Sequence, residues 1–424
     1  MTSPSSGSRR KSAPTAGSYL LAGTVITDGS VFEDVVVVVD DGLIAYVGPR
    51  EGFDTHSVPG LKELAVPSGG AILPGLVDLH CHGAAGGDFP GGRIDAARAA
   101  VDFLHRSGTT TLLASLVTAA PPDLLRGADT LRLLTDEGLI AGIHAEGPFL
   151  SHARCGAQDP RFLLDPDLHL LQELLEHSGG YLRTMTYAPE LPGADRLVRM
   201  LAENRVTPSL GHTDASATST KASLTEATQL LTSTTDASPR PTVTHLFNGM
   251  PPLHHRYPGP VAACLQLAAQ GLVAVELVAD GVHLDVDTVQ MVFTLVGAEN
   301  VVLVTDSMAA TGLPDGDYDL GPASVCVRDG EARLSSNGSL AGGTATLLDV
   351  VRRTIHAGVD PAAVVLSATS VPARILGLEK EVGSLSPGLR ADLVAVDADF
   401  RPVHVLRKGL PLPSAAEGVP VGPA

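Results

Sequence analysis

Short apolar runs alternate with segments of helical periodicity over residues 72–380 of this chain. Such alternation is typical of repeated βα units built around a parallel sheet. Helical spacing is clear over Ile94–His105, which the helix-ending pair Ser107-Gly108 follows, and over Ala194–Glu203. Eight such units predict a closed (β/α)8 barrel of the TIM type. The expected strands are Ile72 to Leu79, Thr109 to Val117, Leu139 to His144, Leu182 to Ala188, Val206 to Leu210, Thr242 to Leu246, Leu272 to Ala279 and Val301 to Thr305.

The two ends of the chain carry a different pattern, in which short apolar runs are broken by tight-turn pairs such as Asp41-Gly42. Runs of this kind predict antiparallel strands. They cover Leu20 to Thr27, Val31 to Val39 and Leu43 to Val47 near the start, and Ala391 to Asp397 and Pro402 to Leu406 near the end. We therefore predict one small β-sandwich, made from residues 18–71 and 381–424, beside a barrel of residues 72–380.

Two further segments fit neither pattern. Residues 1–17 are rich in Ser, Pro, Gly and basic residues and lack a following apolar segment, so we predict a disordered tail without an export signal. The stretch Ser216 to Arg240 is rich in Ser and Thr and longer than a barrel connection needs, and we predict a surface insertion around one helix.

Composition narrows the class of function. The 424 residues carry a formal net charge of -18 and no basic stripe, which argues against nucleic acid or an anionic membrane as a partner. A hydrophobic content of 44% is ample for a buried core, and no run is long enough to span a membrane. The four cysteines form no Cys-x-x-Cys pair, which indicates neither a disulfide framework nor a thiolate zinc site. We expect a cytoplasmic protein.

His80 and His82 end the first expected strand, and side chains two apart on a strand point to the same face. Two such imidazoles can close on one metal ion, although a lone His-x-His also arises by chance. Other ligand-type residues, however, recur where later strands end, and barrel active sites lie at the carboxyl ends of the strands. These residues are Glu146, His212, His245 and Asp306, with His283 just after the seventh strand.

With these residues the chain resembles the amidohydrolase superfamily, whose members arrange such side chains around one or two metal ions. Within it, several blocks look like the N-acetylglucosamine-6-phosphate deacetylases, which act in amino-sugar metabolism. The resemblance implies hydrolysis of an acetamide on a small phosphorylated amino sugar, and a homodimer. The blocks are His144 to Phe149, Gly211 to Ala215, Thr244 to Met250, Asp280 to His283, Thr305 to Met308 and Gly338 to Gly342.

The resemblance also implies a metal site. Glu146, His212 and His245 form a three-ligand set, and Glu146 can take the place of the carboxylated lysine that many relatives carry after strand 4. His80 and His82 either complete a second site or are polar neighbours of a single ion. The number of divalent ions, one or two, therefore stays open; zinc is the expected metal, with iron, manganese or cobalt as alternatives.

The resemblance assigns proton transfer to Asp306, which would also contact the metal, and contact with the reacting carbonyl to His283. A buried structural histidine is the alternative for His283. Arg256 is the main candidate for the phosphate, with a solvated surface arginine as the alternative. Further substrate contacts are implied at Ala157, Asn248, Gly249, Leu340, Ala341 and Gly342.

Two departures from the resemblance concern the sugar contacts. Gln158 stands where many relatives carry histidine, and Tyr257 follows Arg256 where glutamate is common. A different N-acyl sugar or an N-acyl amino acid is therefore a second enzymatic hypothesis. A barrel without catalysis is a third, and the complete set of ligand-type residues argues against it.

Overall fold

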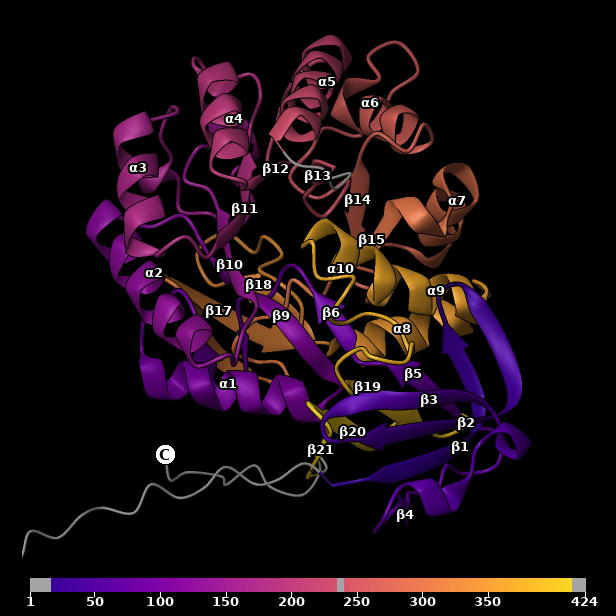
Figure 1. Cartoon of the computed structure of the whole chain (residues 1–424). Helices are drawn as coiled ribbons and strands as arrows, with labels where there is room; N and C mark the ends of the chain where they lie inside the picture. Colours follow the sequence, from indigo (N-terminus) through magenta and orange to yellow (C-terminus); the bar gives the residue numbers. More distant parts are fainter. Residues whose placement is uncertain (1–16, 235–239, 414–424) are drawn as a thin grey trace, which may run out of the picture.

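The computed structural model describes residues 17–234 and 240–413, so the predicted tail lies outside the described residues except for its last position. The described chain forms a barrel surrounded by helices and, beside it, a sheet to which both ends of the chain contribute (Figure 1). None of the helices in these two ranges is long and apolar enough to cross a membrane.

Within the described residues, the barrel sheet contains eight parallel strands that pair in the order of the sequence. Past the ends of the first and last strands, a parallel bridge joins Cys81 to Ser307. The His82 N–H donates to the Ser307 carbonyl at 2.7 Å, and the Asp306 N–H donates to the His80 carbonyl at 2.9 Å. The predicted barrel is confirmed. Its strands are β6 (Leu76–Asp78), β9 (Thr109–Leu116), β10 (Gly142–Glu146), β11 (Leu182–Tyr187), β12 (Thr207–Leu210), β13 (Thr242–Val243), β14 (Ala274–Leu277) and β15 (Val301–Leu303).

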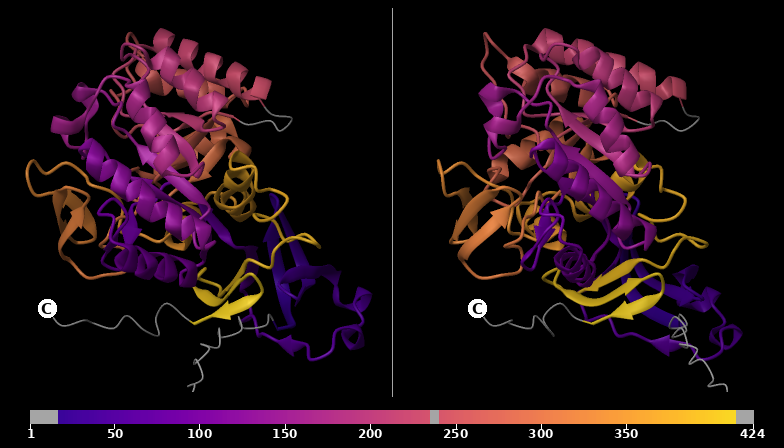
Figure 2. Two further views of the ribbon diagram at one scale, coloured as in Figure 1. Left: turned by 60° about the vertical axis from the view of Figure 1, so that its left-hand side comes forward. Right: turned by 90° about the vertical axis from the view of Figure 1, so that its left-hand side faces the viewer.

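Helices cover the outside of the barrel (Figures 1 and 2). The predicted helix over Ala194–Glu203 is confirmed as α4. Its apolar residues Leu197, Val198 and Leu201 recur at helical spacing and are buried in the core. α8 begins at a capping box in which Thr346 and Asp349 bond each other's backbone N–H groups. The helices are α1 (Ile94–Arg106), α2 (Pro121–Asp136), α3 (Leu168–His177), α4 (Ala194–Glu203), α5 (Ala217–Thr234), α6 (Gly259–Ala268), α7 (Val286–Val296), α8 (Leu347–His356), α9 (Pro361–Ala368) and α10 (Ser370–Ile375).

The one helix predicted within Ser216 to Arg240 is confirmed, but the interpretation of the segment as a surface insertion is wrong; residues 235–239 lie outside the described residues. The segment contains α5, which connects β12 to β13 as a regular helix of the barrel. Leu224 and Ala227 of α5 are fully buried in the main core, and the helix packs against α4 and α6. The Ser- and Thr-rich composition made this helix resemble part of an exposed insertion, but its packing against the barrel overrides the low helix propensity of those residues.

The prediction of a single strand over Ile72 to Leu79 is also wrong. β5 (Ala71–Pro74) belongs to the sheet of the chain ends, and only β6 belongs to the barrel. Gly75 lies between them, and a Cβ there would meet the Thr110 Oγ1 at 2.1 Å. The chain therefore passes from one sheet to the other at a position where only glycine fits.

The predicted pairing of the two chain ends is confirmed, although their described strands form one continuous sheet where a β-sandwich was predicted. Its strand order is β21-β20-β19-β5-β1-β2-β3, with β4 beside β1, so β5 joins the strands of the two ends. Leu21, Val37, Leu393 and Leu406 share one buried cluster across this junction. The other strands are β1 (Tyr19–Thr27), β2 (Ser30–Asp40), β3 (Leu43–Pro49), β4 (Lys62–Glu63), β19 (Leu393–Val396), β20 (Pro402–Arg407) and β21 (Leu410–Leu412).

Some elements were not predicted. Between β15 and α8 the chain forms an antiparallel sheet of β16 (Gly316–Leu320), β17 (Ala323–Arg328) and β18 (Glu331–Leu334), and the hairpin of β7 (Gly83–Ala84) and β8 (Gly87–Asp88) follows β6. The antiparallel sheet packs on its own cluster with Met308, and its last strand leads into the loop of residues 335–342. Short 3-10 helices cover Arg50–Gly52, Thr55–Ser57, His152–Arg154, Pro160–Phe162 and Ala298–Asn300.

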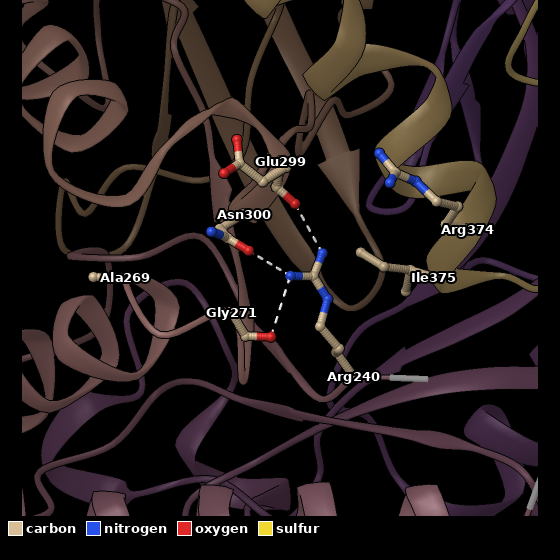
Figure 3. A pocket seen from close by; sticks show the side chains of 7 residues that line it. All are labelled: Arg240, Ala269, Gly271, Glu299, Asn300, Arg374 and Ile375. Atoms are coloured by element: carbon tan, nitrogen blue, oxygen red, sulfur yellow. Dashed lines mark hydrogen bonds between the residues drawn. The ribbon is translucent and has the colours of Figure 1, made fainter. Parts of the chain in front are cut away.

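A cavity of about 470 Å³ lies at the amino-terminal ends of β13, β14 and β15, with Arg374 on its lining (Figure 3). The Arg240 guanidinium donates to the side-chain oxygen of Asn300, to the Glu299 carbonyl at 2.8 Å and to the Gly271 carbonyl at 3.5 Å. Burial, and then the charge of Arg374, lower the pKa of Arg240. Arg240 thus ties together the segments that lead into three barrel strands, at the end of the barrel opposite the predicted site.

Candidate active site

The ligand-type residues predicted from the sequence meet at the carboxyl ends of the barrel strands. Each lies on the last residue of its strand or a few residues beyond it, as the barrel geometry requires. They surround a cavity of about 280 Å³. The residues lining it are His82, Glu146, Gly156, Ala157, Gln158, His212, His245, Asn248, Gly249, His283, Asp306, Leu320, Ser339, Leu340 and Gly342.

One potential metal-binding group consists of Glu146, His212 and His245. The Glu146 Oε1 lies 3.0 Å from the His212 Nε2 and 2.9 Å from the His245 Nε2. The two Nε2 atoms are 3.1 Å apart, and all three residues are buried. Three donor atoms thus converge within bonding reach of a single point.

A second group consists of His80, His82 and again Glu146. The Nε2 atoms of His80 and His82 are 3.0 Å apart, and the Glu146 Oε2 lies 3.2 Å from His82 and 3.7 Å from His80. Asp306 Oδ1 lies 3.4 Å and 3.2 Å from the same two nitrogens. Glu146 therefore offers one carboxylate oxygen to each group, and Asp306 adjoins the second group.

The histidine tautomers fit a bound cation. His212 Nδ1 lies 2.8 Å from the Arg154 carbonyl and His82 Nδ1 lies 3.3 Å from the Ser115 carbonyl. A carbonyl oxygen only accepts, so each ring donates from Nδ1 and its neutral form carries a lone pair on Nε2. In each group the two Nε2 lone pairs face each other and a carboxylate oxygen at about 3 Å. These electron pairs repel one another unless a cation lies between them. The donor set therefore fits a divalent metal ion.

Protons compete with a metal ion for these nitrogens. Burial disfavours a charge on His82, but Asp306 and Glu146 outweigh it and raise the pKa of His82 to about 9. The same carboxylates raise the pKa of His80 well above its ordinary value. Metal binding requires the neutral ring, so at neutral pH a metal ion must displace these protons.

We therefore expect metal binding to release protons at pH 7, and the apparent metal affinity to rise with pH through about pH 9, where half of the His82 rings are neutral without a metal. Proton release can be measured with an indicator dye while metal-free protein in weak buffer is titrated with Mn²⁺. Uptake of Mn²⁺ at pH 7 without proton release would contradict the raised pKa of these histidines.

His283 lies in the cavity lining, with its Nδ1 2.9 Å from the Asp280 Oδ2. Burial opposes a charge on the ring, but the Asp280 carboxylate raises the pKa of His283. Because Asp280 accepts from Nδ1, Nε2 donates a hydrogen bond only when the ring is protonated, and the raised pKa of His283 favours that form. This arrangement fits a donor to a carbonyl oxygen better than a purely structural histidine.

Two residues that support the ligands were not predicted. Gln158 donates from Nε2 to Glu146 Oε2 at 2.7 Å and accepts from the Thr118 N–H at 2.7 Å, so the departure from the resemblance at this position holds a ligand carboxylate. Glu276, buried inside β14, contacts His80. An acid within the apolar run Leu272 to Ala279 was the signal that could have identified it, whereas no sequence signal connects Gln158 to Glu146.

The expected substrate residues divide into two sets. Of the six further substrate contacts that the resemblance implies, five line the cavity: Ala157, Asn248, Gly249, Leu340 and Gly342. The sixth, Ala341, is fully buried and is not part of the lining. At Gly249, with φ +63°, a Cβ would come within 2.9 Å of the His212 Nδ1, so glycine keeps this backbone close to the ligand.

Arg256 lies on an exposed loop before α6 and does not line the cavity. Among the described residues of the lining there is no Lys or Arg. The structure thus does not bring Arg256 together with the other predicted site residues, and the phosphate contact stays a prediction.

Comparisons with known proteins agree with this geometry. Residues 71–415 match the model of the amidohydrolase family. The N-acetylglucosamine-6-phosphate deacetylase of Bacillus subtilis is 32% identical over 91% of this chain and 94% of its own length. The N-acetylgalactosamine-6-phosphate deacetylase of Escherichia coli is 31% identical over 92% of this chain and 98% of its own length.

Among solved structures, a mutant of the N-acetyl-D-glucosamine-6-phosphate deacetylase of Mycobacterium smegmatis in complex with N-acetyl-D-glucosamine-6-phosphate superimposes with a TM-score of 0.83. It is 35% identical, and the match covers 94% of this chain and 100% of that one. The likeness therefore extends over the barrel and the sheet of both chain ends.

Proposed function

This chain belongs to the amidohydrolase family, and we propose that it hydrolyses the acetamide of N-acetylglucosamine 6-phosphate to acetate and glucosamine 6-phosphate. The observation that carries the proposal is the pair of ligand groups sharing Glu146, with Asp306 and His283 on the same cavity. The deacetylases found among its relatives act on phosphorylated amino sugars, which supports this substrate class.

Glu146, His212 and His245 would hold one divalent ion, and His80, His82 and Glu146 a second. A bound ion would polarise the amide carbonyl and make the attacking water more acidic. Imidazole and carboxylate ligands suit zinc, and the same set accepts iron, manganese or cobalt. We favour two ions because both groups are complete.

Asp306 is the proposed proton carrier. Burial alone would raise its pKa, but the neighbouring His80 and His82 outweigh burial and hold the pKa of Asp306 below its ordinary value. The carboxylate is thus ionised at neutral pH and can accept the proton of the water that attacks the carbonyl carbon. During the attack His283 donates to the carbonyl oxygen as it gains charge. As the C–N bond then breaks and the carbonyl reforms, Asp306 passes the proton on to the amine nitrogen.

The phosphate requires a cation that the described lining does not contain. We assign this role to Arg256, because its loop follows Asn248 and Gly249 at the rim of the cavity and a guanidinium suits a phosphate dianion.

If Arg256 binds the phosphate, Arg256→Met will lower kcat/KM for N-acetylglucosamine 6-phosphate by about 10- to 100-fold, the equivalent of a charged hydrogen bond of about 1.5 to 3 kcal/mol. Activity on unphosphorylated N-acetylglucosamine should barely change, because that sugar never makes the contact. Arg161→Met, at another exposed arginine near the cavity, is the matched control. Equal losses on both sugars would make Arg256 structural.

Acetate release by the purified protein tests the proposed reaction. N-acetylglucosamine 6-phosphate, its galacto epimer, N-acetylglucosamine and an N-acetyl amino acid should be compared on one sample with its metal content measured. We expect the first substrate to be preferred. A preference for an unphosphorylated N-acyl compound would favour the second enzymatic hypothesis instead.

We further propose a homodimer in the cytoplasm. Large apolar side chains are exposed at Leu253 and Tyr257, on the loop before α6, and at Met291 and Leu295 on α7, which packs against α6. Such exposure supports a subunit interface. The four cysteines are all free, which is consistent with a reducing compartment.

A further inference from the structure

Glu276 stands out as a buried carboxylate that neither ligand group includes. It lies in the middle of β14 between Val275 and Leu277, and only 2% of it is exposed. Its Oε2 lies 3.2 Å from the His80 Nδ1 and also accepts the His245 backbone N–H at 3.2 Å. One oxygen atom thus contacts a residue of each ligand group.

We propose that Glu276 is a positioning residue that sets the tautomer of His80 and thereby makes the His80–His82 position able to bind a metal ion. A carboxylate oxygen beside Nδ1 requires the Nδ1–H form, which leaves the Nε2 lone pair facing His82, Glu146 and Asp306. Without this acceptor the proton can move to Nε2, which blocks the ligand atom. The inference rests on the proposed metal-dependent function.

The packing around His80 leaves Glu276 as the acceptor for Nδ1. The ring is fully buried, stacked on His245 at 5.5 Å between centroids and edge-on to His144 at 4.5 Å. The structure gives no other partner for Nδ1 among the described residues. Packing fixes the plane of the ring, whereas Glu276 fixes its protonation.

The charges around His80 also support this role of Glu276. Glu146, Asp306 and Glu276 place three carboxylates around His80 at 3.2 to 3.7 Å from its ring nitrogens. In a buried site these acidic groups favour a positive charge at the His80–His82 position, which a metal ion supplies once it displaces the ring protons. Glu276 thus favours occupancy of the position that His80 and His82 provide.

Titration of metal-free protein with Co²⁺, followed by its visible absorption, tests the proposal without substrate. We expect two equivalents in the wild type. Glu276→Ala should keep the equivalent at Glu146, His212 and His245 and weaken the other by about 10- to 100-fold. Glu276→Gln should restore most of that affinity, because an amide oxygen can accept from both the His80 Nδ1–H and the His245 N–H.

Glu190→Ala is the matched control, since this carboxylate bonds Thr213 and Asp214 on a neighbouring loop and contacts no ligand nitrogen. Wild-type binding of both ions by Glu276→Ala, or binding of one Co²⁺ only by the wild type, would overturn the proposal. So would a Gln variant as weak as the Ala variant.

Nitrogen NMR of the zinc-loaded wild type supplies a measurement that does not depend on a variant. The His80 ring should show a protonated Nδ1, and a protonated Nε2 would overturn the proposal. A failure of acetate release with these metal results unchanged would count against the proposed reaction and leave the role of Glu276 intact.

Discussion

Asp306→Asn will keep the metal and the fold and lose turnover, with kcat lower by about 100- to 10,000-fold, the usual contribution of a positioned acid–base group. The amide has nearly the same shape and can still face His80 and His82, but it cannot accept the proton of the attacking water. Steady-state kinetics on a sample with measured metal content checks this result.

Asp214→Asn is the matched control for this experiment. Asp214 follows β12 on the same side of the barrel, pairs with Arg154 and is 46% exposed, outside the cavity lining. It should keep turnover close to that of the wild type. Near wild-type turnover by metal-replete Asp306→Asn would remove Asp306 from proton transfer.

Glu146→Ala will lose metal from both groups, because Glu146 gives one oxygen to each of them. Its carboxylate is the only acidic member of either group. Burial opposes ionisation of Glu146, but the neighbouring histidines outweigh burial and hold the pKa of Glu146 well below its ordinary value. Removing it leaves only neutral nitrogens at His212 and His245, and only the adjoining Asp306 carboxylate at His80 and His82. We expect kcat to fall by at least about 1,000-fold, since metal polarisation of a carbonyl contributes several kcal/mol.

Metal analysis after dialysis against chelator decides this prediction. Gln158→Ala removes the hydrogen bonds to the Glu146 Oε2 and from the Thr118 N–H but keeps the Glu146 carboxylate, and it should retain at least the ion at His212 and His245. If Glu146→Ala still holds one equivalent, the primary ligand set is wrong.

Much of the site was predictable because a barrel imposes a simple rule on its sequence. Each strand is a short apolar run, and functional side chains follow at its carboxyl end. His80, His82, Glu146, His212, His245 and Asp306 all obey this rule, and the structure brings them together. The sequence order of strands was enough to place them, since parallel strands in a barrel pair in that order.

The residues that sequence reasoning missed act through contacts between distant segments. Glu276 reaches His80 across 196 positions of the chain, and its side-chain direction depends on the register of β14 in the closed sheet. Gln158 lies on a loop, where no periodicity indicates which way a side chain points. The switch of sheets at Gly75 likewise depends on Thr110, a residue on another strand.

The sequence by itself determined the barrel, the pairing of the two chain ends and the residues that could bind metal. Apolar periodicity and position at a strand end are local properties, and they appear in the sequence because buried positions must be apolar. Only the tertiary structure decided that Glu146 serves both ligand groups and that Asp306 adjoins the second. Only it showed that Arg256 is not part of the cavity lining. These are distances between atoms on different strands and loops, and they are set by barrel closure and loop packing, which no local pattern encodes.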